Sequence, residues 1–177
     1  MRRIILLVWV FALAASAAAA QVKSDAADDS NLTARPKSYV GDYAKVIDER
    51  VEQQLERKLA ALRASAGIEF VVVTIETTGA EDIFDYSLAA ARRWRLAKGA
   101  NDKGGILLML AITDRKWRVQ LTDSLRTDLP ETVLKVHGER MNAALRQTNN
   151  PGTAVSVFTD GIIAHLARLR APKRGAR

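Results

Sequence analysis

Asp102 and Asp123 are the acidic residues whose spacing best supports chemistry. They flank residues 104–121, which read as two strands joined by a tight turn. Because the far ends of an antiparallel pair meet, Asp102 is expected close to Thr122 and Asp123 in space. A hard cation such as calcium takes about six to eight oxygen ligands, and Asp102, Asp123 and Asp128 could supply three. The alternative is that these carboxylates only cap local backbone groups. This alternative is favoured, because aspartates in loops commonly bond to nearby backbone in this way.

The chain lacks the residues that several other kinds of catalytic site need. The chain has no cysteine, which excludes disulfides, thiol catalysis and zinc–thiolate sites. GANDKGG is glycine-rich but lacks phosphate-loop spacing, and no G-x-S-x-G motif occurs. The two histidines, His137 and His165, fall on different predicted helices. His137 shares an apolar stripe with Leu134 and Met141, which favours a packed histidine at the edge of the core.

Seven segments must position these residues. Apolar spacing predicts a helix between Asp48 and Gly67, with Asp48 as N-cap, and further helices over 83–95, from Pro130 to about 146, and from Asn150-Pro151 onward. Nearly continuous apolar runs predict buried strands at 68–75 and 104–112, and alternation predicts a half-exposed strand at 116–121. Gly161, inside the last helix, has no explanation from propensity and suggests close packing.

The order helix, strand, helix, strand, strand, helix, helix predicts the fold class. A strand–helix–strand unit implies a parallel pair, and the turn at 113–115 makes the third strand antiparallel. We therefore expect an α/β protein, a three-layer α/β/α sandwich with a small mixed sheet.

The two ends of the chain are read as signals outside the fold. Arg2 and Arg3, an apolar stretch and Ala18-x-Ala20 predict a signal peptide over 1–20, so we expect a chain that is exported, periplasmic or secreted. An uncleaved membrane anchor is the alternative. Residues 21–38 read as a flexible linker, 39–169 as one domain, and 170–177 as a basic tail.

The formal net charge of +7 resides in the ends. Residues 1–20 and 168–177 account for all of it, so residues 21–167 carry no net charge. Aromatic residues do not interleave with basic ones as nucleic-acid platforms require, and we expect no nucleic-acid partner. The basic tail could contact an anionic surface or an acidic partner, although such ends are commonly frayed and solvated.

Four segments, YVGDYAKVID, DYSLAAARRW, DKGGILLMLAITDRKWRV and a later LP, resemble the TPM domain family over about Ser38 to Ala167. The resemblance implies an α/β/α sandwich. It also implies a link to acid-phosphatase activity, to calcium binding, or to the assembly and upkeep of membrane complexes.

Position by position, Asp42 fits the family's early aspartate, Trp94 the tryptophan that closes the second helix, and Asp102 with Gly104 the D-N-G before the long strand. The hairpin turn matches at 114–116. The family's G-x-G-L-E, however, is replaced by TDSLR at 122–126, and its usual glycine by Ala97. Arg126 thus stands where the family has an acid.

Two hypotheses follow. The first is an exported, non-catalytic accessory or binding domain that assists a protein or membrane complex. The second is an acid-phosphatase-like hydrolase of phosphate esters that depends on calcium or magnesium, with metal held by Asp42, Asp102 and Asp123, and with Arg126 contacting phosphate. The lost acid favours the first, because Arg126 could instead pair with Asp102 and replace a cation.

Overall fold

A computed structural model describes residues 33–171 of the chain. The helices are α1 (Glu49–Ala66), α2 (Ile83–Arg93), α3 (Glu131–Thr148) and α4 (Pro151–Arg170). The strands are β1 (Val40–Asp42), β2 (Ile68–Ile75), β3 (Gly104–Ala111) and β4 (Lys116–Leu121), followed by a short 3-10 turn, η2 (Asp123–Leu125). The expected signal peptide, 1–20, lies outside the described residues, as do residues 172–177 of the basic tail.

The four strands form one sheet in the order β1-β2-β3-β4. β1 and β2 are parallel, β2 and β3 are parallel, and β3 and β4 are antiparallel. The predicted parallel pair and hairpin are therefore confirmed. β1 is an addition that the sequence did not predict, because its three residues are too few to show a period.

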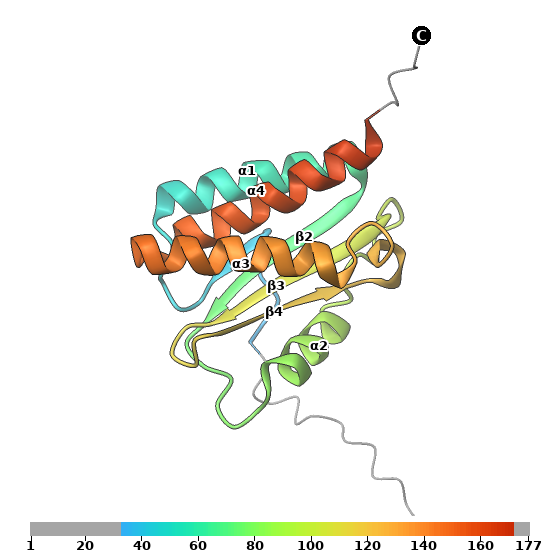
Figure 1. The fold of residues 1–177 in the computed structure, drawn as a ribbon. Coiled ribbons are helices and arrows are strands. Elements are labelled where there is room, and N and C mark those ends of the chain that lie inside the picture. Colours follow the sequence, from blue (N-terminus) through green and yellow to red (C-terminus); the bar gives the residue numbers. More distant parts are fainter. Residues whose placement is uncertain (1–32, 172–177) are drawn as a thin grey trace, which may run out of the picture.

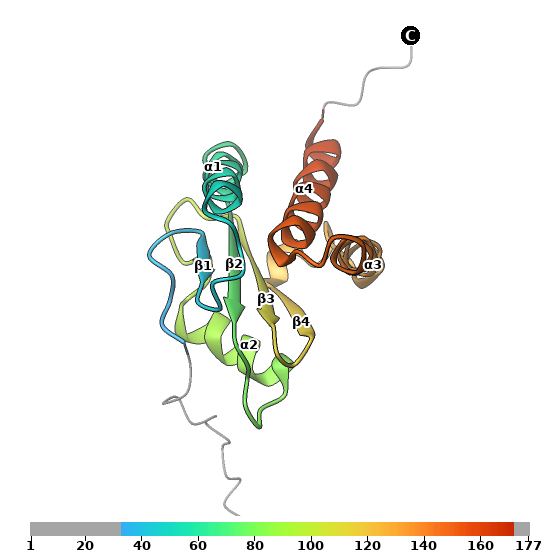
Figure 2. The ribbon, with the colours of Figure 1, turned by 90° about the vertical axis from the view of Figure 1, so that its left-hand side faces the viewer.

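Helices cover both faces of the sheet, which confirms the α/β/α sandwich (Figures 1 and 2). α1, α3 and α4 lie on one side, and α2 lies on the other. Alternate residues of the central strands supply the two cores: Phe70 and Leu108 pack toward α1 and α4, whereas Val73 and Met109 pack toward α2. β2 and β3 are buried along their whole length, as their apolar sequences predict.

One buried position departs from the expected pattern of β4. The alternation that predicts a half-exposed strand at 116–121 places Gln120 on the polar side, but Gln120 is 8% exposed. α2 covers that side, and the Gln120 amide donates to the Phe84 carbonyl and to the Ser87 hydroxyl. Arg118 remains exposed and lies over the Phe84 ring, 4.6 Å from its centroid.

α3 and α4 contact each other and cover β4 on the side of the sheet where α1 also lies (Figure 1). Gly138 of α3 meets Trp117, whose indole N–H donates to Asn142 at 3.0 Å. Gly161 of α4 meets the His137 ring so closely that a Cβ would lie 2.3 Å from Nδ1. Close packing therefore explains the glycine that helix propensity does not.

The folded region begins before residue 38, earlier than the linker prediction allowed. Pro36 is buried against Gly41, and Thr33 lies 3.0 Å from the Tyr86 hydroxyl. Arg35 contacts the Glu69 carboxylate. These contacts could not be predicted because the segment is polar and aperiodic. In the part of the chain that the structure describes, no helix combines the length and apolarity needed to cross a membrane.

Candidate functional site

Asp102 lies at the amino end of β3, in the segment that connects α2 to the sheet. Its side chain is 3% exposed. The Arg63 guanidinium donates from Nε to Oδ1 and from Nη2 to Oδ2, both at 3.1 Å. The Gly99 backbone N–H adds a third bond to Oδ2 at 2.8 Å. Both carboxylate oxygens are therefore engaged by protein donors, in the bidentate geometry that arginine favours.

A second buried acid, Glu69 of β2, lies beside this pair. Its side chain is 4% exposed. Oε1 accepts from Arg35 Nη2 at 2.5 Å and from Arg63 Nη1 at 3.4 Å, and Oε2 accepts from the Ala97 N–H at 2.6 Å. Arg35 also donates to the Trp94 carbonyl. We call Arg35, Arg63, Glu69 and Asp102 the amino-edge cluster; its two cations balance its two anions.

The end of α1 places Arg63 in this cluster. Gly67 ends the helix in the left-handed region, at φ 67°, and its carbonyl accepts the Lys103 N–H at 2.6 Å. A Cβ at Gly67 would lie 2.8 Å from the Asn101 carbonyl, so only glycine fits. Burial lowers the pKa of Arg63, but Tyr39 and the Asp102 and Glu69 carboxylates raise it, and the net change is upward. The guanidinium is thus held in its charged form.

Ala97 shows how the cluster holds the loop after α2. Its φ is 53°, in the region that glycine favours, which explains why the family pattern has glycine there. The hydrogen bond from its N–H to Glu69 holds the alanine in this conformation. Trp94 ends α2, as the resemblance implied, and is 6% exposed.

The ends of β3 and β4 meet as predicted, but Asp123 does not turn toward Asp102. The Gly105 N–H donates to the Thr122 hydroxyl at 2.8 Å. Asp123 is 95% exposed and accepts from Arg126 Nε at 2.8 Å, within the η2 turn. The suggested pairing of Arg126 with Asp102 is therefore wrong, because Arg63 occupies that position.

Asp42 lies at the opposite end of the sheet. Its carboxylate accepts from the Val46 and Ile47 N–H groups, at 3.1 and 2.8 Å, and from the Thr74 hydroxyl. Asp42 pairs in register with Thr74, and Thr74 with Leu110. Asp102 precedes Leu110 by eight residues, about 26 Å at ~3.3 Å per residue. The structure therefore does not bring Asp42 together with Asp102.

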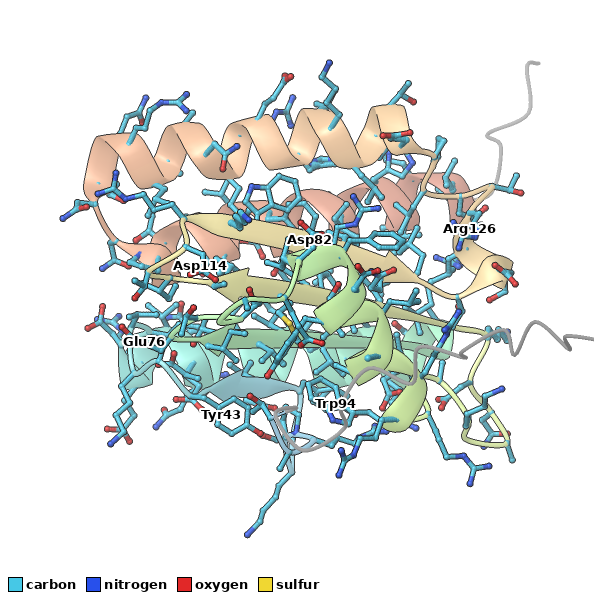
Figure 3. The ribbon with its side chains drawn as sticks, turned by 90° about the horizontal axis from the view of Figure 1, so that it is seen from below. Tyr43, Glu76, Asp82, Trp94, Asp114 and Arg126 are labelled. Carbon is cyan, nitrogen blue, oxygen red and sulfur yellow. The ribbon has the colours of Figure 1, made fainter. Side chains whose placement is uncertain are left out.

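The hairpin turn shares this carboxyl edge with Asp42. Figure 3 shows Asp114 and Glu76 at one end of the sheet and Arg126 at the other. Asp114 accepts from the Thr77 hydroxyl at 2.8 Å and from the Thr78 N–H at 2.9 Å. The Thr78 backbone bond, the Thr77 bond and the Lys116 charge lower the pKa of Asp114. The Asp114-Arg115-Lys116 motif thus links the hairpin to the loop after β2.

No three His, Asp or Glu side chains gather as a metal-binding group within residues 33–171. Asp128, a third candidate from the sequence, lies beside the end of α4, where its carboxylate is 3.5 Å from Arg170 Nη2. The sequence analysis missed Arg35, Arg63 and Glu69. Glu69 carried a usable signal: it is the one charged residue in IEFVVVTI, and a charge in a strand covered on both faces needs a partner.

Solved structures with the same fold include the following three. The N-terminal domain of a P. gingivalis protein is 24% identical, covers 78% of this chain and 88% of its own, and has a TM-score of 0.67. The BA42 protein of Bizionia argentinensis is 13% identical, and the match covers 70% of this chain and 83% of the BA42 chain, with a TM-score of 0.60. The N-terminal domain of a Corynebacterium glutamicum protein is 14% identical, and the match covers 82% of this chain and 93% of that domain's chain, with a TM-score of 0.59. At these identities the likeness shows the fold alone.

Sequence comparison identifies the family. A search of curated proteins finds no match. The TPM domain, in contrast, matches residues 40–165, which span β1 through most of α4 and include Asp42, Asp102 and the hairpin turn. Apart from Tyr39, the first residue of YVGDYAKVID, the segments that suggested the resemblance fall within this match. The chain therefore belongs to the TPM domain family.

Proposed function

We propose that this chain is an exported, non-catalytic accessory domain that assists a protein or membrane complex. The observation that carries the proposal is the state of Asp102. Its carboxylate is 3% exposed, and Arg63 and Gly99 satisfy both oxygens. A cation or a substrate phosphate at this position would have to displace an arginine that is already paired.

The charge around Asp102 also supports an accessory role. The amino-edge cluster is neutral overall, so it offers little net attraction to a divalent cation. Asp123, the nearest candidate across the hairpin, already pairs with Arg126 and is almost fully exposed. Replacing the family's acid with Arg126 removes a ligand and adds a positive charge, which disfavours cation binding at that end of the sheet.

The alternative is a calcium- or magnesium-dependent phosphatase. Metal-assisted hydrolysis needs carboxylates that hold the ion while an electrophile contacts the phosphoryl oxygens. Asp42 and Asp102 are too far apart to share one ion. A phosphatase site would therefore require the amino-edge cluster to open, freeing Asp102 from Arg63.

The proposed partner is a protein or membrane complex outside the cytoplasm. The predicted signal peptide supports export, and the basic residues of 168–177 support contact with an anionic surface. α4 carries the first two of these, Arg168 and Arg170, to its carboxyl end. Arg170 is 3.5 Å from Asp128, which leaves Arg168 as the more available cation.

Calcium and magnesium titration by calorimetry, with hydrolysis of p-nitrophenyl phosphate, tests the proposal on the chain without residues 1–20. Wild type is compared with Asp102→Asn, and Asp123→Asn is the matched control at an exposed acid. We expect no saturable cation binding and no turnover that depends on Asp102. Saturable binding or turnover lost in Asp102→Asn but kept in Asp123→Asn would overturn the accessory assignment. Circular dichroism establishes that both variants are folded.

A further inference from the structure

A groove of about 310 Å3 lies between α3 and α4, away from the amino-edge cluster. α3 and α4 contact each other and diverge toward the start of α3 and the end of α4 (Figures 1 and 2). Both histidines of the chain line it, together with two arginines. The lining includes Thr132, Val136, His137 and Arg140 from α3, and His165 and Arg168 from α4.

The two histidines face each other at the groove. Their ring centroids are 6.3 Å apart, at an interplanar angle of 75°. His137 is 5% exposed, and its Nδ1 is buried without a hydrogen-bond partner. Because the backbone at Gly161 closes off Nδ1, Nε2 is the ring nitrogen that can serve a ligand. A neutral ring with its proton on Nε2 would leave Nδ1 as an unpaired acceptor and present a donor to the groove.

His165 is oriented by the chain itself. Its Nε2 lies 3.1 Å from the Asp128 carbonyl. Nε2 therefore donates to that carbonyl, and Nδ1 takes the second proton when the ring is charged. The Asp128 carboxylate lies beside Arg170, so it does not neutralise the arginines of the groove.

Arg140 and Arg168 have no ion pair among residues 33–171, and both are exposed. This contrasts with the amino-edge cluster, where each arginine meets a buried carboxylate. The pKa of His137 is lowered mainly by burial, and interactions with Arg140, His165 and Arg168 lower it further. The two arginines thus act on one buried ring, and no carboxylate of the described residues forms an ion pair with either of them.

We propose that the groove between α3 and α4 binds an oxyanion, of the phosphate or carboxylate type, through Arg140, Arg168 and the Nε2 donor of His137. Guanidinium groups present planar pairs of N–H donors that match such anions. Val136, 47% exposed, offers the organic part of the ligand an apolar contact. The proposal shares Arg168 with the suggested contact to an anionic surface. It uses none of the residues of the amino-edge cluster, so the outcome of the Asp102 experiment does not decide it.

Proton NMR of the histidine rings tests this site directly. The pKa of each histidine is measured in sodium chloride, inorganic phosphate and sodium acetate at matched ionic strength. Phosphate and acetate form separate arms that distinguish the two kinds of oxyanion. We expect at least one of them to raise the pKa of His137 by about one unit, because an opposite charge within ~4–6 Å favours the protonated ring. Equal pKa values in all three salts would overturn the proposal.

Variants show whether the groove produces the effect. In Arg140→Gln/Arg168→Gln the anion-dependent rise should disappear. Arg146→Gln is the matched control, because Arg146 is also an exposed arginine of α3 but does not line the groove. A rise that persists in the double variant, or that disappears equally in the control, would contradict binding at this groove. The substituted arginines are exposed, so the double variant should fold, which its ring resonances also report.

Discussion

Gly161→Ala reverses the effect that helix propensity predicts. Gly161 lies in the interior of α4. At an exposed position of this kind, alanine would stabilise a helix by about 1 kcal/mol relative to glycine. In this chain the added methyl group would point at the imidazole of His137, on the neighbouring helix.

The distances set the size of the effect. A Cβ at residue 161 would lie 2.3 Å from His137 Nδ1 and 2.7 Å from Cε1, whereas nonbonded carbon contacts are most favourable near ~3.5–4.0 Å. The ring is confined by Phe158 and His165, whose centroids lie 6.5 and 6.3 Å from it. Overpacking of this kind costs about 1–3 kcal/mol. After the propensity gain of about 1 kcal/mol is deducted from this cost, we expect Gly161→Ala to lower the free energy of unfolding by up to about 2 kcal/mol.

A double-mutant cycle measured by urea unfolding tests this reasoning. The set is wild type, Gly161→Ala, His137→Ala and the double variant. Without the imidazole, the new methyl group no longer clashes, so Gly161→Ala should stabilise the His137→Ala background by up to about 1 kcal/mol. The reasoning is refuted if Gly161→Ala stabilises the wild type, or if it costs the same in both backgrounds.

Two further predictions concern charge. Arg63→Met leaves the 3%-exposed Asp102 without its counterion, and because Arg63 is itself 37% exposed we expect a loss of about 2 kcal/mol in urea unfolding. Arg126, 66% exposed, pairs with the 95%-exposed Asp123, so Arg126→Met should cost under about 0.5 kcal/mol; equal losses in the two variants would contradict the distinction. Burial and nearby cations lower the pKa of His137, so the unfolded chain binds the proton more readily. This residue's stabilisation is present above its unfolded pKa, ~6.5, and is lost as pH falls below it. His137→Gln should flatten that slope between about pH 7 and 5; an unchanged slope would argue against it.

The sequence predicted the elements of this fold well where a pattern extended over many residues. The apolar runs of β2 and β3 and the stripe on α1 each repeat often enough to be unambiguous. β1 offered no such repeat. Because β1 was missing from the predicted fold, the prediction did not separate Asp42 from Asp102. In the structure, the parallel strand β1 places Asp42 at the carboxyl edge of the sheet, whereas Asp102 precedes β3 at the amino edge. Recognising β1 would have separated the two acids.

The partner of Asp102 was beyond prediction from the sequence. Arg63 is one of several basic residues on α1, and its role depends on where the end of that helix lies over the sheet. The predicted hairpin correctly placed Thr122 beside the start of β3, where its hydroxyl accepts from the Gly105 N–H. The direction of the Asp123 side chain, however, depends on the η2 turn, and the sequence TDSLR does not predict that turn. Position along a strand could be predicted, whereas the choice among nearby charged partners could not.

The strand order protects the chain against aggregation. IEFVVVTI and GGILLMLA, the segments of β2 and β3, are mostly apolar and contain a single charged residue, Glu69, so they resemble segments that stack into fibrils. In the fold they pair with each other at the centre of the sheet. One edge is β1, only three residues long, and the other is β4, which exposes Lys116 and Arg118. A short edge and a charged edge both discourage strand addition by a second molecule. Variants that unfold the chain should therefore be lost as precipitate before they accumulate as dissolved unfolded protein.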